Sequence, residues 1–344
     1  MAKVARILSI DGGGIRGIIP ALILQRIEER TEKPISELFH MVAGTSTGGI
    51  LACALTAPVI NRRPRDAAEV VGLYRDRGGE IFDSSFWHGF GSLGGIADEK
   101  YESKNLENIL SEYLQDSRLS DIEQDLLITS YNIELRKPFF FKSWKAKGYK
   151  LRKGETRQDR DFYLKDVARA TSAAPTYFEP ALVNSVNGKK FPLIDGGVFA
   201  NNPAMCALSS ARILYPKKTR FLIVSIGTGE TQREIPYDKA KDWGLIGWTR
   251  PVLYIFMDGA SDAVNYHLEQ EFLERDYFRF QIDLKADPAD ESAPNDDMDD
   301  ARPENIKLLE GEAQRLMDLE KSKLNRLIQQ LKNPITDKSE LNSN

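Results

Sequence analysis

The chain has 344 residues, and its 47 basic and 51 acidic side chains leave a formal net charge of −4. That length suits one large α/β domain or two smaller ones, and the balanced charge gives no electrostatic reason to expect a nucleic-acid partner. Only Cys53 and Cys206 are present, so a disulfide framework is excluded and both are expected to be buried free thiols.

The sequence shows no obvious membrane or export signal. No apolar run approaches the roughly 20 residues that a membrane-spanning helix needs, and the first ten residues lead directly into a glycine-rich stretch, unlike a signal peptide. We therefore expect a cytoplasmic or otherwise soluble protein that meets a membrane only at its surface.

The first part of the chain repeats one pattern of strand, glycine-rich loop and helix. An apolar run at 4–10 is followed by glycines at 12–14 and by helical spacing over 18–30. A second buried run, at 38–42, ends in a glycine-flanked serine, and a helix-like run follows at 50–55. This alternation predicts an α/β fold with a mostly parallel sheet, helices on both faces, and ligands beyond the carboxyl ends of the strands.

The later elements fit a single domain, which we place at residues 1–335, followed by a polar tail at 336–344 that should fray. Pro251 should break or begin the helical run in which it lies. The charged stretch at 145–160 is predicted to be a loop, and the acidic stretch at 287–303 an exposed loop. Helices are predicted at 66–79, 102–115, 166–171, 243–272 and 304–331 and from Asn201-Asn202-Pro203 onward, and strands at 126–133, 138–144, 191–194, 221–226 and, at an edge, 277–282.

The serine lies in the sequence Gly44-Thr45-Ser46-Thr47-Gly48. Glycines on both sides would let the strand and the helix approach closely, and would tolerate the strained turn that exposes the Ser46 hydroxyl. The hydroxyl would lie near a helix N-terminus, where partial positive charge favours a developing anion. Ser46 is therefore predicted to be a nucleophile.

The first glycine-rich loop, at residues 11–17, is compatible with two functions. Gly12-x-Gly14-x-x-Gly17 satisfies the dinucleotide-binding pattern of an oxidoreductase, although the second strand lacks the expected acidic residue and Asp11 would lie near the pyrophosphate. In the other interpretation, the backbone N–H groups of Gly12, Gly13 and Gly14 hold an oxyanion. Arg16 would add a positive charge or form a structural ion pair in the loop.

A serine hydroxyl needs a base, and the three histidines suit that role poorly. His40 lies inside the predicted strand before Ser46, His88 lies in an aromatic loop, and His267 is in the middle of a predicted helix. A Ser-His-Asp triad is therefore disfavoured.

Asp195 is the better candidate for the base. It ends the apolar run at 191–194 and is followed by Gly196 and Gly197, which would put it on the same carboxyl rim as Ser46. An apolar setting would raise its basicity. The alternative is that Asp195 only forms a turn before the glycines.

Taken together, these motifs resemble those of the patatin-like phospholipases. The resemblance covers Asp11 to Gly17, the pentapeptide around Ser46, and Asp195-Gly196-Gly197, and extends over about residues 5–320. Further similar features are Ala173-Ala174-Pro175-Thr176-Tyr177-Phe178, Asn201-Asn202-Pro203 and Asp276-Tyr277-Phe278-Arg279.

The resemblance implies a lipid acyl hydrolase with a three-layer α/β/α fold, a modified α/β hydrolase. Ser46 would attack the ester, Asp195 would act as its base, and Gly12 to Gly14 would hold the oxyanion, without a metal or cofactor. The implied partner is a phospholipid or other acyl lipid at a membrane or micelle surface. Some bacterial members are effectors switched by cyclic nucleotides, so a small-molecule activator of unknown identity is also conceivable, as is a family member that has lost turnover.

Two apolar segments could line an acyl channel, touch a lipid surface, or pack in the core. The first segment contains Phe82, Phe86, Trp87 and Phe90. The second contains Trp243, Leu245, Ile246 and Trp248. The aromatic residues at 139–141 and Trp144 are assigned to the core.

Overall fold

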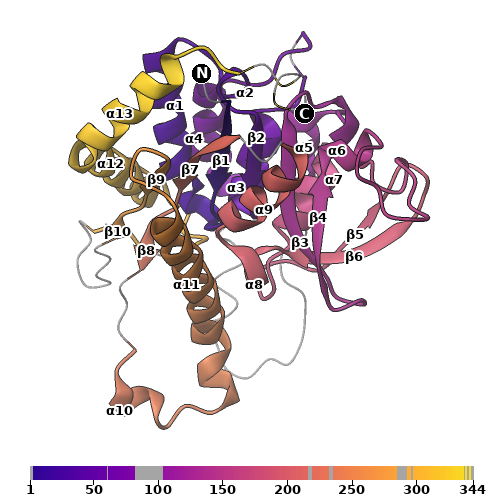
Figure 1. Cartoon of the computed structure of the whole chain (residues 1–344). Coiled ribbons are helices and arrows are strands. Elements are labelled where there is room, and N and C mark those ends of the chain that lie inside the picture. The colour runs from indigo at the N-terminus through magenta and orange to yellow at the C-terminus, as the bar shows by residue number, and fades with distance from the viewer. Residues whose placement is uncertain are drawn as a thin grey trace.

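The computed structural model describes residues 3–59, 61–81, 104–215, 219–231, 235–284, 293–295, 297–336, 338 and 341 (Figure 1). The aromatic segment that contains Phe82, Phe86, Trp87, His88 and Phe90 lies outside the described residues.

A mostly parallel sheet forms the centre of the molecule, as predicted. Its strands follow the order β5-β6-β3-β2-β1-β7-β9, and β4 also pairs with β3. The pairs that join β3, β2, β1, β7 and β9 are parallel, whereas β4, β5 and β6 are joined by antiparallel pairs. The strands are β1 (Val4–Ile10), β2 (Met41–Gly44), β3 (Asp125–Asn132), β4 (Lys137–Lys142), β5 (Ala181–Asn184), β6 (Lys190–Asp195), β7 (Arg220–Ile226) and β9 (Tyr277–Phe280), with β8 (Glu230–Thr231) and β10 (Asp283–Leu284) in a separate pair.

Helices cover both faces of this sheet (Figure 1). Successive side chains of a strand point to opposite faces, so Leu8 and Ile10 of β1 join one buried cluster and Ala5 and Ile7 join the other. The described helices are α1 (Ile18–Thr31), α2 (Ile35–Leu38), α3 (Thr47–Ala54), α4 (Ala67–Ile81), α5 (Lys104–Leu114), α6 (Ser143–Ala146), α7 (Leu164–Thr171), α8 (Gly197–Ala200), α9 (Ala204–Leu214), α10 (Tyr237–Ala240), α11 (Leu245–Glu271), α12 (Pro303–Leu319) and α13 (Lys321–Lys332), with 3₁₀ turns at Gly14–Gly17 and Leu119–Asp121.

The ends of β2 and β6 meet beside β3. Gly44 of β2 lies opposite Ile128, and Asp195 of β6 lies opposite Ser130, two residues further along β3. Both of these β3 residues also pair with strand β4. A strand has only two edges, and β4 occupies one of them. Strands β2 and β6 therefore lie on the same side of β3 and approach each other head to head, carboxyl end to carboxyl end.

This arrangement corrects the reason for expecting Asp195 near Ser46. We expected both residues at the carboxyl rim of parallel strands, but β6 runs antiparallel to β3. Asp195 reaches the site from the opposite direction, because β6 ends where β2 ends.

Several predicted boundaries were wrong. The run at 38–42 is not one strand, since α2 ends at Leu38 and β2 begins at Met41. Pro251 lies inside α11, which is continuous around it. The run at 304–331 forms two helices that meet at Glu320, and α9 begins at Ala204, with Pro203 as its N-cap residue.

The predicted exposed loop and fraying tail also make buried contacts. In the described part of the 287–303 stretch, Asp299 and Ala301 are buried and the Met298 carbonyl accepts a hydrogen bond from the Ile15 amide. In the tail, Lys338 forms an ion pair with Asp125, and Leu341 is buried. Among the described residues, no helix is both long and apolar enough to cross a bilayer. Cys53 is buried and Cys206 half-buried, and both are free thiols.

Candidate active site

Ser46 occupies a strained turn between β2 and α3. Its backbone angles are φ 53° and ψ −124°, in a region that residues with side chains rarely adopt. The turn needs glycines because a Cβ on Gly44 would lie 2.1 Å from the Gly48 carbonyl oxygen, and one on Gly48 would lie 2.3 Å from the Ile10 carbonyl oxygen. The Ser46 amide donates to Thr171 Oγ1 at 2.9 Å, which fixes the turn against α7.

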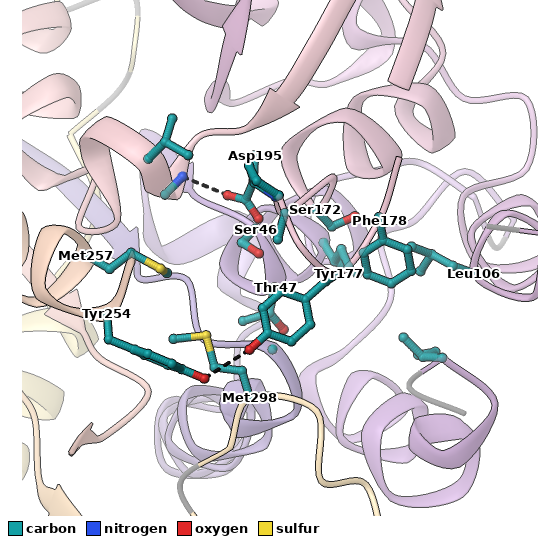
Figure 2. Close-up of a pocket in the computed structure, with 17 residues that line it drawn as sticks. Ser46, Thr47, Leu106, Ser172, Tyr177, Phe178, Asp195, Tyr254, Met257 and Met298 are labelled. Carbon is teal, nitrogen blue, oxygen red and sulfur yellow. Dashed lines mark hydrogen bonds between the residues drawn. The ribbon is translucent and has the colours of Figure 1, made fainter. Parts of the chain in front are cut away.

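Asp195 lies beside Ser46 at the inner end of the cavity (Figure 2). It is 3% exposed and accepts a hydrogen bond at Oδ1 from the Gly197 amide at 2.7 Å. Burial raises the pKa of Asp195 to about 7, although the neighbouring Ser46 side chain and the Gly197 amide oppose the rise. A Cβ on Gly196 would lie 2.1 Å from Thr129 Oγ1, so this turn also needs a glycine.

The glycine loop after β1 is held by contacts on both sides. The Gly12 amide donates to the Asn201 carbonyl oxygen at 3.1 Å, and the Gly12 carbonyl accepts from Thr228 Oγ1 at 2.8 Å. The prediction that the Gly12 amide faces an oxyanion is therefore wrong, because that amide already has an acceptor. The amides of Gly13 and Gly14 have none among the described residues, and Gly14 lines the cavity.

The charged residues of this loop are buried away from Ser46. Asp11 pairs with Arg279 of β9 at 2.7 Å, and Arg279 Nη1 also donates to Ser225 Oγ at 2.9 Å. Burial raises the pKa of Asp11, and the Arg279 guanidinium opposes that rise. Arg16 is 3% exposed, and its Nε donates to the Gly13 carbonyl at 3.4 Å. A Cβ on Gly17 would lie 2.3 Å from Thr47 Oγ1.

Neither described histidine is placed to serve Ser46. His40 precedes β2, contrary to the prediction; its Nδ1 accepts from the Arg6 amide, and its Nε2 lies 2.7 Å from the Thr336 carbonyl oxygen. His267 is exposed on α11.

An apolar cavity adjoins Ser46 and Asp195 (Figure 2). It holds about 720 Å³ of empty space counted out to its open mouth. The hydroxyls of Tyr177, from the loop after α7, and Tyr254, from α11, meet across the cavity at 3.0 Å. Its larger apolar and aromatic lining residues are Ile50, Ile81, Leu106, Pro175, Tyr177, Phe178, Val198, Tyr254, Met257 and Met298.

Sequence reasoning missed much of the support for this site. Thr171, Thr228 and Met298 hold the serine turn and the glycine loop from distant parts of the chain. No sequence motif marks them. Asn201 and Arg279 do lie in segments already noted for their resemblance, and that was the available signal.

The histidine, cysteine and acidic side chains of the described part of the chain do not gather into a group of three that could hold a metal ion. The cavity walls are apolar and would suit a hydrophobic acyl chain. At one end of the cavity lie a hydroxyl group, from Ser46, a carboxyl group, from Asp195, and backbone amides.

Comparison with known proteins agrees with this chemistry. Residues 8–208 match the sequence model of the family described as patatin-like phospholipase. Patatin-like protein 2 of Oryza sativa subsp. indica is 35% identical over 321 residues, covering 82% of this chain and 77% of that protein. A protein of Solanum tuberosum called probable inactive patatin-3-Kuras 1 is 33% identical over 313 residues, covering 82% of this chain and 79% of that protein.

Among solved structures, the chain is similar to VipD from Legionella pneumophila, with a TM-score of 0.38 and 13% identity, covering 92% of this chain and 67% of that one. That likeness is too weak to carry an argument.

Proposed function

Because the chain belongs to the patatin-like phospholipase family, we propose that it is a serine acyl hydrolase that cleaves fatty-acyl esters of phospholipids or related acyl lipids. The observation that carries the proposal is that Ser46 and the buried Asp195 lie side by side in the wall of one apolar cavity. A nucleophile within reach of a base of suitable pKa is the minimum that acyl transfer needs.

In the proposed first step, Ser46 Oγ attacks the ester carbonyl carbon while Asp195 takes up the hydroxyl proton. A pKa of about 7 lets this carboxylate accept a proton near neutral pH. The carbonyl oxygen becomes an oxyanion held by the amides of Gly13 and Gly14, which have no acceptor among the described residues. Each donor of this type is worth roughly 3 kcal/mol of barrier.

The intermediate then collapses, and the C–O bond to the lipid alcohol breaks. That alcohol leaves with the proton from Asp195, and the acyl group remains esterified to Ser46. In the second half, Asp195 takes a proton from water as its oxygen attacks the acyl carbonyl, and the proton returns to Ser46 Oγ as the fatty acid leaves. The apolar walls would hold the acyl chain during both steps.

We further propose that α11 brings this site to a lipid surface. Its first half presents Trp248, Val252, Ile255 and Phe256, which are 36%, 37%, 45% and 62% exposed. In Figure 1 this end of α11 extends away from the sheet together with α10. The same helix carries Tyr254 into the cavity wall, so a lipid that contacts this face lies near the cavity mouth.

The dinucleotide-binding alternative has little support in the geometry. The Gly12 amide is taken by Asn201, and the Ile15 amide is taken by Met298. A Cβ on Gly14 would lie 1.9 Å from the Met298 carbonyl oxygen, so the loop is covered where a pyrophosphate would lie. Activation by a cyclic nucleotide, suggested by the resemblance, stays a prediction.

The test is hydrolysis of a short-chain p-nitrophenyl ester and of mixed phospholipid vesicles, with fluorophosphonate labelling of the serine. We expect Ser46→Ala to abolish labelling, and Ser46→Ala and Asp195→Asn each to lower kcat at least about 10³-fold. Mass spectrometry of the released lipids identifies the bond that is cut. If both variants keep the wild-type rate, the proposed mechanism is wrong; an inactive wild-type protein would point to a member that has lost turnover.

A further inference from the structure

A second hollow, separate from the cavity beside Ser46, is lined by positive charge. It lies between the end of β4, the loop that follows α6, and α9, and it shares no lining residue with the cavity over Ser46. Among the described residues, five cationic side chains and no acidic ones line it, although the whole chain has a net charge of −4. These cations are Lys142, Lys145, Lys150, Arg152 and Arg160.

Lys142 is the most informative of these residues. Its Nζ donates to Ser210 Oγ at 3.3 Å and lies 4.9 Å from the centre of the Phe140 ring and 5.3 Å from that of Trp144. Within the described chain, no carboxylate lies within ion-pair distance of it. Burial lowers the pKa of Lys142 to about 8, and the neighbouring cations add to the effect. A partly buried ammonium without a counter-ion is costly unless an anion is supplied.

One carboxylate, that of Glu155, neutralises part of the positive charge of the cluster. Glu155 pairs with Lys145 at 2.9 Å and with Arg160 at 2.6 Å, which holds these two cations in fixed positions. Lys150 and Arg152 are exposed, and no ion pair joins either to a carboxylate in the described chain. Five lining cations and one carboxylate leave four positive charges (5 − 1 = 4) around about 760 Å³ of open space.

From this geometry we infer that the hollow is a binding site for a small anion that carries two or more phosphate groups. A single phosphate at neutral pH carries at most two charges, so two phosphates match the uncompensated charge. Lysine binds phosphate as a point charge, and arginine binds it with two parallel N–H donors. The shared chemistry fits both a free polyphosphate, such as a nucleotide, and the phosphorylated headgroup of a lipid.

The first test is calorimetric titration of the full chain with sodium pyrophosphate at low salt. We expect saturable binding that weakens as salt rises and that falls at least about tenfold in Lys142→Gln. Lys150→Gln/Arg152→Gln, in which both side chains are exposed, should show a similar loss without disturbing the fold. The matched control is Lys189→Gln. Lys189 also lies over an aromatic ring, with its Nζ 5.7 Å from the centre of the Phe191 ring, but it is outside the hollow. The affinity of this variant for pyrophosphate should stay within twofold of wild type.

A second readout separates a phosphate site from a merely structural lysine. A bound anion should raise the pKa of Lys142, so binding of ATP, whose phosphates are already deprotonated at pH 8.5, should take up protons from the buffer at that pH. Lys142→Gln should abolish this uptake. The other groups that face Lys142 are the cations Lys145, Lys150, Arg152 and Arg160 and the thiol of Cys206 on α9, and burial raises the pKa of Cys206 to about 11.

Two further probes distinguish a free polyphosphate from the headgroup of a lipid. The first is ATP, and the second is phosphatidylcholine vesicles with or without phosphatidylinositol bisphosphate. Binding of either phosphorylated probe that Lys142→Gln weakens supports the site and identifies its source. The inference is overturned if pyrophosphate, ATP and the phosphorylated vesicles all fail to bind the wild-type chain, or if they bind the folded pocket variants as tightly as wild type.

Discussion

Two buried carboxyl groups, one in the cavity wall and one behind the glycine loop, have different surroundings. Asp195 is the last residue of β6 and is 3% exposed, and Asp11 directly follows β1 and is 2% exposed. The neighbours of Asp195 are the Ser46 side chain and the Gly197 amide, both uncharged, whereas the partner of Asp11 is the Arg279 guanidinium at 2.7 Å.

Under the proposed mechanism, one fold uses buried acids for two purposes. With no cation to offset its burial, Asp195 has a pKa of about 7 and can exchange a proton near neutral pH. Asp11 has its charge matched by Arg279, and together they tie the start of the glycine loop to β9. Burial raises both pKa values, to about 7 for Asp195 and to about 6 for Asp11, so the kind of partner rather than the depth of burial distinguishes the proposed base from the structural acid.

The largest effect is expected on stability when the structural pair is broken. Asp11→Asn leaves Arg279 buried without a carboxylate, and removing one partner of such a pair costs about 3–5 kcal/mol of unfolding free energy. Chemical denaturation measures the loss. Arg279→Met in the same chain removes the unpaired charge, so the double variant should regain much of the stability. A double variant no more stable than Asp11→Asn would contradict the pairing argument.

Asp195→Asn should have the opposite effect on stability. Burial raises the pKa of Asp195 in the folded chain from its ordinary value of 3.8 to about 7, so the unfolded chain releases this proton more easily. Its contribution to stability is therefore present below about pH 4 and is lost as pH rises through about 7. We expect Asp195→Asn to be more stable than wild type by roughly 2–4 kcal/mol at pH 8 and similar to it at pH 4. Equal stability at both pH values would show that Asp195 carries no burial cost.

The pH dependence of activity provides a third comparison of the two acids. The proposed base acts only when Asp195 is ionised, so kcat/KM for a soluble ester should fall below about pH 7 and be roughly 100-fold lower at pH 5 than on the plateau. Arg279→Met/Asp11→Asn, which lacks the other buried acid, should keep the same apparent pKa. A profile that is flat from pH 5 to 8 in the wild type would exclude Asp195 as the group that limits the rate.

Local patterns predicted the main elements and singled out the two side chains of the proposed mechanism. The strand, glycine turn and helix around Ser46 follow from residues adjacent in sequence, and the structure places Asp195 beside that serine as expected. The direction of β6 could not be predicted, because a short apolar run before Asp195 fits a parallel or an antiparallel strand equally well.

The failures concern contacts between distant segments. The acidic stretch near Met298 has the composition of an exposed loop, but its backbone supplies an acceptor to the Ile15 amide. Gly12 was grouped with Gly13 and Gly14 because all three are glycines, and only its contact with Asn201 distinguishes it. Such partners are set by tertiary packing, which a single sequence does not contain.

The smallest predicted effect tests whether the structural acid stays separate from the chemistry. Ser225 is fully buried, and its Oγ accepts a hydrogen bond from Arg279 Nη1 at 2.9 Å. Ser225→Ala removes that acceptor but leaves the pair between Asp11 and Arg279 intact, so it should cost about 1–2 kcal/mol of unfolding free energy. Because Ser225 does not line the cavity, kcat for the soluble ester should stay within twofold. A tenfold loss of kcat in a folded Ser225→Ala protein would mean that Arg279 and Asp11 influence the reaction, and the two carboxyl groups could then no longer be assigned separate roles.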